Sequence, residues 1–94
     1  MAEPDWLLVE ESLIGAFAGV NTSAAGAIDL AGPWAEHGLG VRLDVADDSL
    51  SVTVVGPDGT EDSIWEGPLS DWNEESQGEA AHESLAAMGG FLGD

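Results

Sequence analysis

Two runs of alternating apolar and polar residues occupy the middle of the chain. The apolar positions of the two runs are Val41, Leu43, Val45 and then Leu50, Val52, Val54. Alternation with a period of two, bounded by turn-forming residues, is typical of antiparallel strands that bury one face. Polar residues at 47–49 separate the two runs, and Pro57 and Gly59 mark the next turn. The stretch 39–66 therefore predicts a three-stranded meander.

Apolar residues at helical spacing flank this meander on both sides. In residues 3–20 they recur at intervals of three and four: Trp6, Val9, Leu13, Phe17 and Val20. This spacing predicts a helix whose apolar stripe lies on the sheet. A second helix is expected to begin near Asn73 or Gly78 and to end at Met88, where Gly89 follows as a stop signal.

Residues 21–40 have a weaker pattern. Residues 21–23 favour a turn, residues 27–30 are compatible with a short edge strand, and residues 34–37 with a single helical turn. We therefore expect one α+β domain over residues 1–94, with a three- or four-stranded antiparallel sheet and both helices packed on one face. The expected core contains Trp6, Phe17, Trp34, Val41, Leu43, Val45, Val52, Val54, Ile64, Trp65, Leu85 and Met88.

Charge changes this picture more than any motif does. The 94 residues include 19 Asp and Glu against a single basic side chain, Arg42, for a formal charge of -18. Such a surface repels nucleic acid and anionic membranes and attracts basic surfaces. The chain has no Cys, which excludes disulfides and thiolate metal sites. An acidic N-terminus disfavours a secretory leader, so we expect a cytoplasmic protein.

Candidate chemistry is sparse. The sequence lacks Cys, Lys and a Gly-x-Ser-x-Gly motif, which leaves no activated nucleophile, and we expect neither enzymatic activity nor a cofactor. Glu79 and His82 have the Glu-x-x-His spacing of di-iron carboxylate proteins, but those sites need two copies. Asp58 opens a calcium-loop-like pattern that has Ser63 instead of Gly and Leu69 instead of Glu. Both patterns fit a solvated surface better than a metal site.

The acidic side chains themselves are the candidate site. Glu75, Glu79 and Glu83 recur every four residues and would form one stripe on the second helix, with a rise of about 6 Å per step. This interval resembles the repeat of charges along a nucleic-acid strand. A second row is expected from the turns of the sheet. The predicted partner-binding residues are Asp44, Asp47, Asp48, Asp58, Glu61, Asp62, Glu75, Glu79 and Glu83.

In size, extreme acidity, missing Lys and helix-strand-strand-strand-helix order, the chain resembles the small acidic DNA-mimic inhibitors of phages and mobile elements, including anti-CRISPR and anti-restriction proteins. The resemblance implies a viral protein that acts in the host cytoplasm without catalysis. Its partner would be a basic DNA- or RNA-binding protein, such as a defence nuclease, a CRISPR effector or a repair enzyme, blocked by protein-protein interaction in its basic channel.

The acidity is also compatible with two further roles. The chain could be an acidic binding module for a different kind of basic protein, or a small domain adapted to high salt, in which carboxylates maintain hydration. Pairing of two copies through the sheet edge is left open as well. The tripeptide 65–67 resembles the signature of the Trp-x-Gly family of helical hairpins, but the neighbouring strand pattern favours a Trp that closes the core at a strand end.

Overall fold

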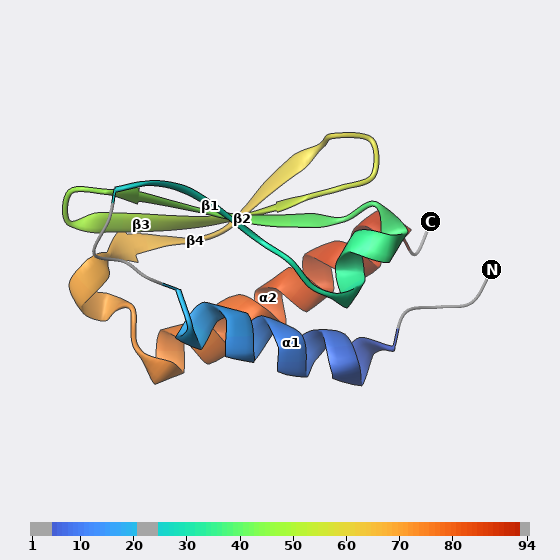
Figure 1. The fold of residues 1–94 in the computed structure, drawn as a ribbon, viewed down its shortest axis with the longest axis horizontal. Coiled ribbons are helices and arrows are strands. Elements are labelled where there is room, and N and C mark those ends of the chain that lie inside the picture. The colour runs from blue at the N-terminus through green and yellow to red at the C-terminus, as the bar shows by residue number, and fades with distance from the viewer. Residues whose placement is uncertain (1–4, 21–24, 93–94) are drawn as a thin grey trace.

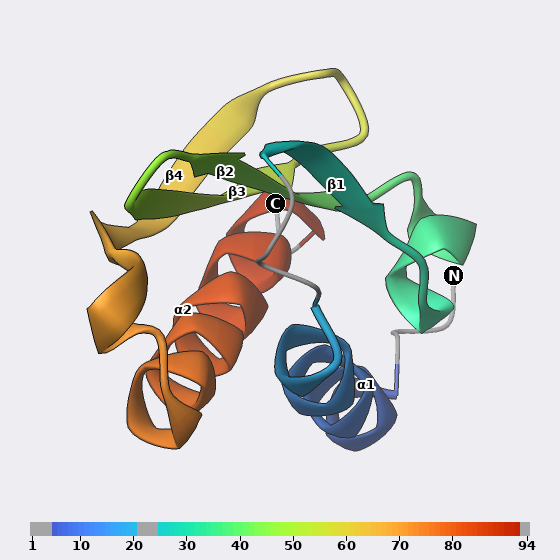
Figure 2. The same ribbon diagram turned by 60° about the vertical axis from the view of Figure 1, so that its left-hand side comes forward.

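The computed structural model describes residues 5–20 and 25–92, which form two layers. One layer is an antiparallel sheet with the strand order β1-β2-β3-β4, and α1 and α2 lie together on one face of it (Figure 1, Figure 2). The elements are α1 (Trp6–Ala18), β1 (Gly26–Leu30), the 3-10 helix η1 (Pro33–His37), β2 (Gly40–Ala46), β3 (Ser49–Val55), β4 (Glu61–Pro68), the 3-10 helix η2 (Leu69–Asp71) and α2 (Glu74–Leu92). The expected α+β class is confirmed, with four strands.

The N-terminal helix packs through the stripe that its spacing predicted. Asp5 caps α1, and its carboxylate accepts a hydrogen bond from the backbone N–H of Leu8 at 3.2 Å. The stripe consists of Val9, Leu13 and Phe17, which are buried, and of Trp6 and Val20, which pack against the core at its margin. The helix is shorter than predicted, and residues 3 and 4 lie outside the described residues, as does the turn expected at 21–23.

The sheet has the predicted alternation. Side chains on the helix-facing side of β2 and β3 are buried: Val41, Leu43, Val45, Leu50, Val52 and Val54. The segment 27–30 does form the edge strand β1, in which Ile28 pairs with Leu43 and Leu30 with Val41. A two-residue turn joins β2 to β3, and Asp47 adopts the positive φ of 49° that such tight hairpins require.

A β-bulge in β4 interrupts this alternation. Val52 pairs with Trp65 and Thr53 with Ser63, so Ile64 is an extra residue on β4. Strict alternation from Ser63 would place Trp65 on the outer face of the sheet. The bulge instead directs both Ile64 and Trp65 to the helix side, where they pack against the core. The tripeptide 65–67 thus lies within a strand rather than in the turn of a helical hairpin.

The C-terminal helix begins with a reciprocal cap. Asn73 Oδ1 accepts hydrogen bonds from the backbone N–H groups of Glu75 at 2.9 Å and Ser76 at 3.1 Å. In return, the Asn73 N–H donates to the Ser76 hydroxyl at 2.8 Å. The helix extends to Leu92, beyond the predicted end at Met88. Neither helix is long and apolar enough to cross a bilayer, as far as the described residues go.

Small buried residues of α2 let it approach α1 and the sheet: Ala80, Ala81 and Ser84. Most of the expected core residues are buried, while four are only partly buried: Trp6, Ile64, Trp65 and Leu85. The core also includes residues that the expected set lacks: Val9, Leu13, Leu39, Leu50, Ala80 and Ala81. The helix layer and one face of the sheet thus share a single core, and the other face of the sheet is left open.

Candidate partner-binding surface

The structure distributes the nine predicted acids over four places. Three are on α2: Glu75, Glu79 and Glu83. Asp44 and Glu61 are on the outer face of the sheet, on β2 and β4. Asp47 and Asp48 occupy the β2–β3 turn, whereas Asp58 and Asp62 are near the β3–β4 turn. The two turns are at opposite ends of β3, about 20 Å apart at a rise of about 3.3 Å per residue. The sheet turns therefore do not form the second row that we expected.

The row on the second helix does form. Glu75, Glu79 and Glu83 are exposed at four-residue intervals within α2, which places them along one side of the helix. The distance from the first to the last corresponds to about 12 Å of helix. Like charges at this spacing repel each other by about 0.2–0.5 kcal/mol per pair. The stripe therefore costs folding stability unless another molecule supplies positive charge.

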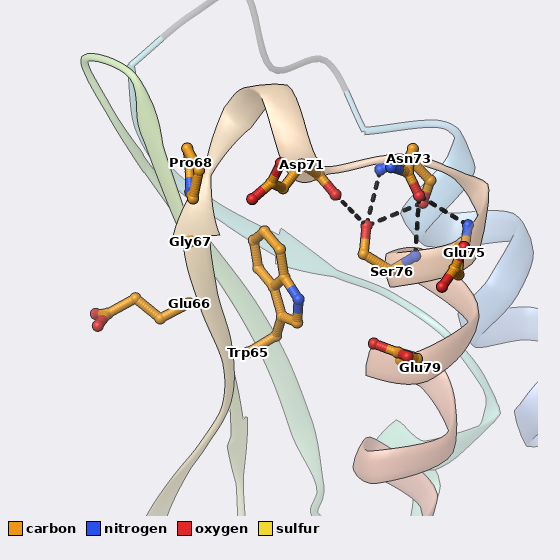
Figure 3. A pocket seen from close by; sticks show the side chains of 9 residues that line it. All are labelled: Trp65, Glu66, Gly67, Pro68, Asp71, Asn73, Glu75, Ser76 and Glu79. Carbon is orange, nitrogen blue, oxygen red and sulfur yellow. Dashed lines mark hydrogen bonds between the residues drawn. The ribbon is translucent and has the colours of Figure 1, made fainter.

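This stripe forms one wall of an open groove between β4 and α2. One hollow of about 350 Å³ is lined by Trp65 and Gly67 on the strand side and by Glu75, Ser76 and Glu79 on the helix side (Figure 3). A second hollow of about 690 Å³ continues along the helix, and it is lined by Ile64, Trp65, Gly78, Glu79, His82 and Glu83. Trp65 and Glu79 belong to both hollows. We call the two together the β4–α2 groove.

A further acidic side chain lies at one end of this groove. Asp71, in η2, lines the first hollow beside the N-terminus of α2. Glu66 also lines the first hollow, but its side chain projects from β4 away from Trp65, toward the outer face of the sheet (Figure 3). Asp62 pairs with the inward-facing Val54 but lines neither hollow. The acids of the groove are thus those of the helix stripe, with Asp71 beside the first hollow.

The Trp65 ring is held in place by Gly67 of its own strand and by the ring of Trp72. Its ring centroid lies 5.0 Å from that of Trp72, with an interplanar angle of 56°. Trp72 in turn packs edge-on against the buried Phe17 at 5.6 Å. A Cβ at Gly67 would lie 3.2 Å from the Trp65 indole, so any larger residue at this position would crowd the ring. The groove therefore has a fixed and partly exposed aromatic wall.

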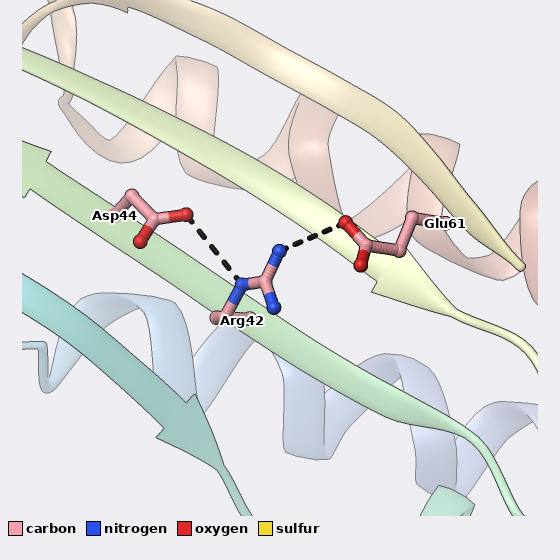
Figure 4. A network of polar contacts seen from close by, with 3 residues as sticks. All are labelled: Arg42, Asp44 and Glu61. Atoms are coloured by element: carbon pink, nitrogen blue, oxygen red, sulfur yellow. Dashed lines mark hydrogen bonds and ion pairs between the residues drawn. The ribbon is translucent and has the colours of Figure 1, made fainter. Parts of the chain in front are cut away.

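The only Arg in the chain lies on the opposite face of the sheet. Its Nη2 donates to Glu61 Oε1 at 2.9 Å, and its Nε lies 3.5 Å from Asp44 Oδ2 (Figure 4). Asp29 of β1 is directly opposite Arg42 in the register. Two of the predicted partner-binding acids, Asp44 and Glu61, are thus already paired within the protein. The one positive side chain is engaged on the outer face, and none remains for the groove.

Residues of both turns make local hydrogen bonds, in one turn through a carboxylate and in the other through a backbone carbonyl. Asp58 Oδ1 accepts a hydrogen bond from the backbone N–H of Thr60 at 3.0 Å. That bond, with a second one from the Thr60 hydroxyl, holds the pKa of Asp58 below its ordinary value of 3.8. The carbonyl of Asp48 accepts from the N–H of Leu69 at 2.6 Å, which places the β2–β3 turn beside the start of η2. Asp47 and Asp48 therefore lie at the same end of the molecule as Asp71.

Comparison with protein-family models, curated proteins and solved structures finds no match to this chain. Function must therefore be inferred from the chemistry of the surface. Within residues 5–20 and 25–92, no three His, Asp or Glu side chains are grouped so that they could hold a metal ion. The resemblance to DNA-mimic inhibitors finds no relative to support it, and it stays a hypothesis.

Sequence reasoning missed one residue of the groove and the local cause of another. Trp65 was expected to close the core, and it does pack against the core, but alternation gives no indication of the bulge that turns its ring to the helix side. Asp71 was not singled out, because its position depends on how η2 leads from β4 to α2. Two adjacent bulky apolar residues, Ile64 and Trp65, on a strand that buries one face are the signal that could have indicated the bulge.

Proposed function

We propose that this protein binds the basic, nucleic-acid-binding surface of another protein and blocks it by competition. The observation that carries the proposal is the row of Glu75, Glu79 and Glu83 beside the β4–α2 groove, on a side of the molecule without Lys or Arg. Carboxylates about 6 Å apart offer Lys and Arg of a partner the charge-assisted hydrogen bonds that they otherwise make with phosphates. Binding would also release counterions, as DNA does.

The proposed action needs no catalysis. A partner that recognises a polynucleotide backbone uses a channel rich in Lys and Arg, and the acidic surface would occupy that channel. The target class is a DNA- or RNA-binding enzyme of defence or repair, such as a nuclease or a CRISPR effector. The protein would then act in the cytoplasm of the cell that contains this enzyme, as an inhibitor encoded by a phage or another mobile element. Charge attraction would accelerate the encounter, most strongly at low salt.

The experiment is a capture from cell lysate, with the folded protein immobilised and with duplex DNA or a neutral polymer added as competitor. The expected result is that DNA, but not the neutral polymer, releases the bound protein at constant ionic strength. The released target should then bind the wild-type chain about tenfold more tightly than the double variant Glu79→Lys, Glu83→Lys. Captured proteins that DNA does not displace would refute nucleic-acid mimicry.

The matched control carries the same charge change elsewhere. Glu11→Lys with Glu36→Lys alters two exposed acids away from the groove, on α1 and η1. Each Glu→Lys change removes one negative charge and adds one positive charge, so both double variants shift the formal charge from -18 to -14. If the stripe is the interface, the control should retain most of the affinity. Equal losses in both variants would mean that net charge alone drives binding.

High-salt adaptation makes a different prediction. A domain whose acids serve only hydration should lose its structure below molar salt, whereas an inhibitor of this kind should be folded in ordinary buffer. A thermal unfolding experiment in about 0.1 M and in molar salt separates the two hypotheses. An unfolded chain at the lower salt concentration would favour adaptation over inhibition.

A further inference from the structure

The β4–α2 groove combines charge with an aromatic wall. Trp65 forms the strand side of both hollows, and Glu79 projects from α2 toward the side on which Trp65 lies (Figure 3). Glu83 lies one turn further along the helix and lines the second hollow. The arrangement suits a cation that is also flat, because such a group can stack on an indole while its edge donates hydrogen bonds to carboxylates.

Gly78 supplies the space for such a group. It is in the fifth position of α2, where glycine is unfavourable compared with alanine. A Cβ built at Gly78 meets no atom within 4 Å, so no close packing contact explains the glycine. The residue lines the second hollow together with Trp65, Glu79 and Glu83. The missing side chain leaves more open space in a hollow that the aromatic ring and the carboxylates share.

The rigidity of the aromatic wall makes it suitable for binding. Trp72 packs against the Trp65 indole and is itself supported by Phe17, so the indole loses little conformational freedom when another group stacks on it. A nucleic-acid base could stack on the same ring, but its phosphates would be repelled by the carboxylates opposite. A lysine ammonium would be attracted as a point charge, without the flat face that an indole matches.

We propose that the β4–α2 groove receives an arginine side chain of the partner, with its guanidinium stacked on Trp65 and hydrogen-bonded to Glu79 and Glu83. This inference rests on the proposed function and adds to it, because it names the group that the groove selects. The acidic stripe attracts any basic surface, whereas the groove discriminates arginine from lysine. The partner's contacting segment must then present an arginine that extends beyond its neighbours.

The test compares two peptides of equal charge, nona-arginine and nona-lysine, titrated into the isotopically labelled protein at about 0.15 M salt. The expected result is that nona-arginine binds about two- to fivefold more tightly than nona-lysine. Nona-arginine should also shift the NMR signals of the Trp65 indole N–H and the Gly78 amide, whereas nona-lysine should leave the indole signal nearly unchanged.

Gly78→Leu places an apolar side chain in the second hollow without removing a charge, and leucine favours a helix more than glycine does. This variant should bind nona-arginine no better than nona-lysine. The matched control is Gly90→Leu, an exposed position of the same helix where a Cβ also meets nothing within 4 Å and which does not line the groove. The control should preserve the preference for arginine.

The failures of the two proposals are distinguishable. Equal affinities for the two peptides, both reduced by Glu79→Lys with Glu83→Lys, would overturn the arginine site and leave the acidic surface as the interface. A preference for arginine that Gly78→Leu leaves unchanged would overturn the placement in the groove. No binding of either peptide would count against both proposals.

Discussion

The stripe on α2 predicts that one of its acids opposes folding. Glu79 has Glu75 four residues before it and Glu83 four residues after it, and all three are exposed. Each like-charge pair at this spacing destabilises a helix by about 0.2–0.5 kcal/mol. Glu79→Gln removes both pairs and keeps a residue of similar helix propensity. The expected gain in the free energy of unfolding is about 0.4–1 kcal/mol, or about 2–8 °C in Tm for a domain of this size.

The assay is thermal unfolding followed by circular dichroism in low and in molar salt. At 0.01 M ionic strength the Debye length is about 30 Å, and at 1 M it is about 3 Å, so the gain should be largest at low salt. Glu11→Gln is the matched control, because it removes one exposed acid from the middle of α1. Residues 7, 8, 14 and 15, its neighbours at helical spacing, are uncharged.

The two variants have the same net charge, so their difference isolates local repulsion along the stripe. At low salt, the Tm of Glu79→Gln should be higher than the Tm of Glu11→Gln. In 1 M salt, the two Tm values should become similar. A variant at position 79 that is no more stable than the control at low salt would refute the reasoning. The same substitution should weaken binding of a basic partner. Stability and affinity then change in opposite directions, as expected when a surface is arranged for binding rather than for folding.

Four further predictions concern other parts of the molecule. Arg42→Met removes two partly exposed ion pairs and should cost about 0.5–2 kcal/mol in urea unfolding at low salt; an equal loss in 1 M salt would contradict this cause. Ser84 has a buried hydroxyl without a hydrogen-bond partner among the described residues, so Ser84→Ala should raise the free energy of unfolding by about 1 kcal/mol. Ser76→Ala removes the hydroxyl half of the reciprocal cap and should lower the free energy of unfolding by about 1–2 kcal/mol. Similar effects of Ser84→Ala and Ser76→Ala would be evidence against this assignment. The pKa of Asp58 is lower in the folded protein than in the unfolded chain. Its hydrogen bonds from Thr60 therefore stabilise the fold above pH 3.8, and this contribution is lost as the pH falls through the pKa of the folded state. An NMR titration of the Asp58 carboxylate with a midpoint at or above 3.8 would contradict this.

Much of the fold followed from local patterns. Alternation over 41–54 predicted β2 and β3, and spacing of three and four predicted α1, because burial of one face imposes those periods on any strand or helix. The edge strand β1 was left open, since a five-residue strand at an edge carries little pattern. For α2, Asn73 was one of two expected starts, and the cap that it forms decides between them. The helix end was missed, because Gly89 and Gly90 are compatible with either a stop or a continuation.

The candidate site was predictable only in part. The stripe of Glu75, Glu79 and Glu83 follows from helical spacing alone. The second row expected from the sheet turns does not exist, because an antiparallel meander places successive turns at opposite ends of the sheet. Composition could not indicate that Arg42 would engage Asp44 and Glu61 on the outer face, since that pairing depends on strand order and register.

The sequence by itself determined the charge, the two kinds of element and the face that each must bury, since these depend on residues near one another in the chain. Only the tertiary structure decided how Trp65 comes to face the helix layer. One extra residue in β4 reverses the alternation, so the ring turns to the helix side while Glu66 turns outward. That reversal depends on how β4 pairs with β3 and packs on α2, which are contacts between distant parts of the chain. It brings an aromatic wall against a row of carboxylates whose spacing was already set by the helix.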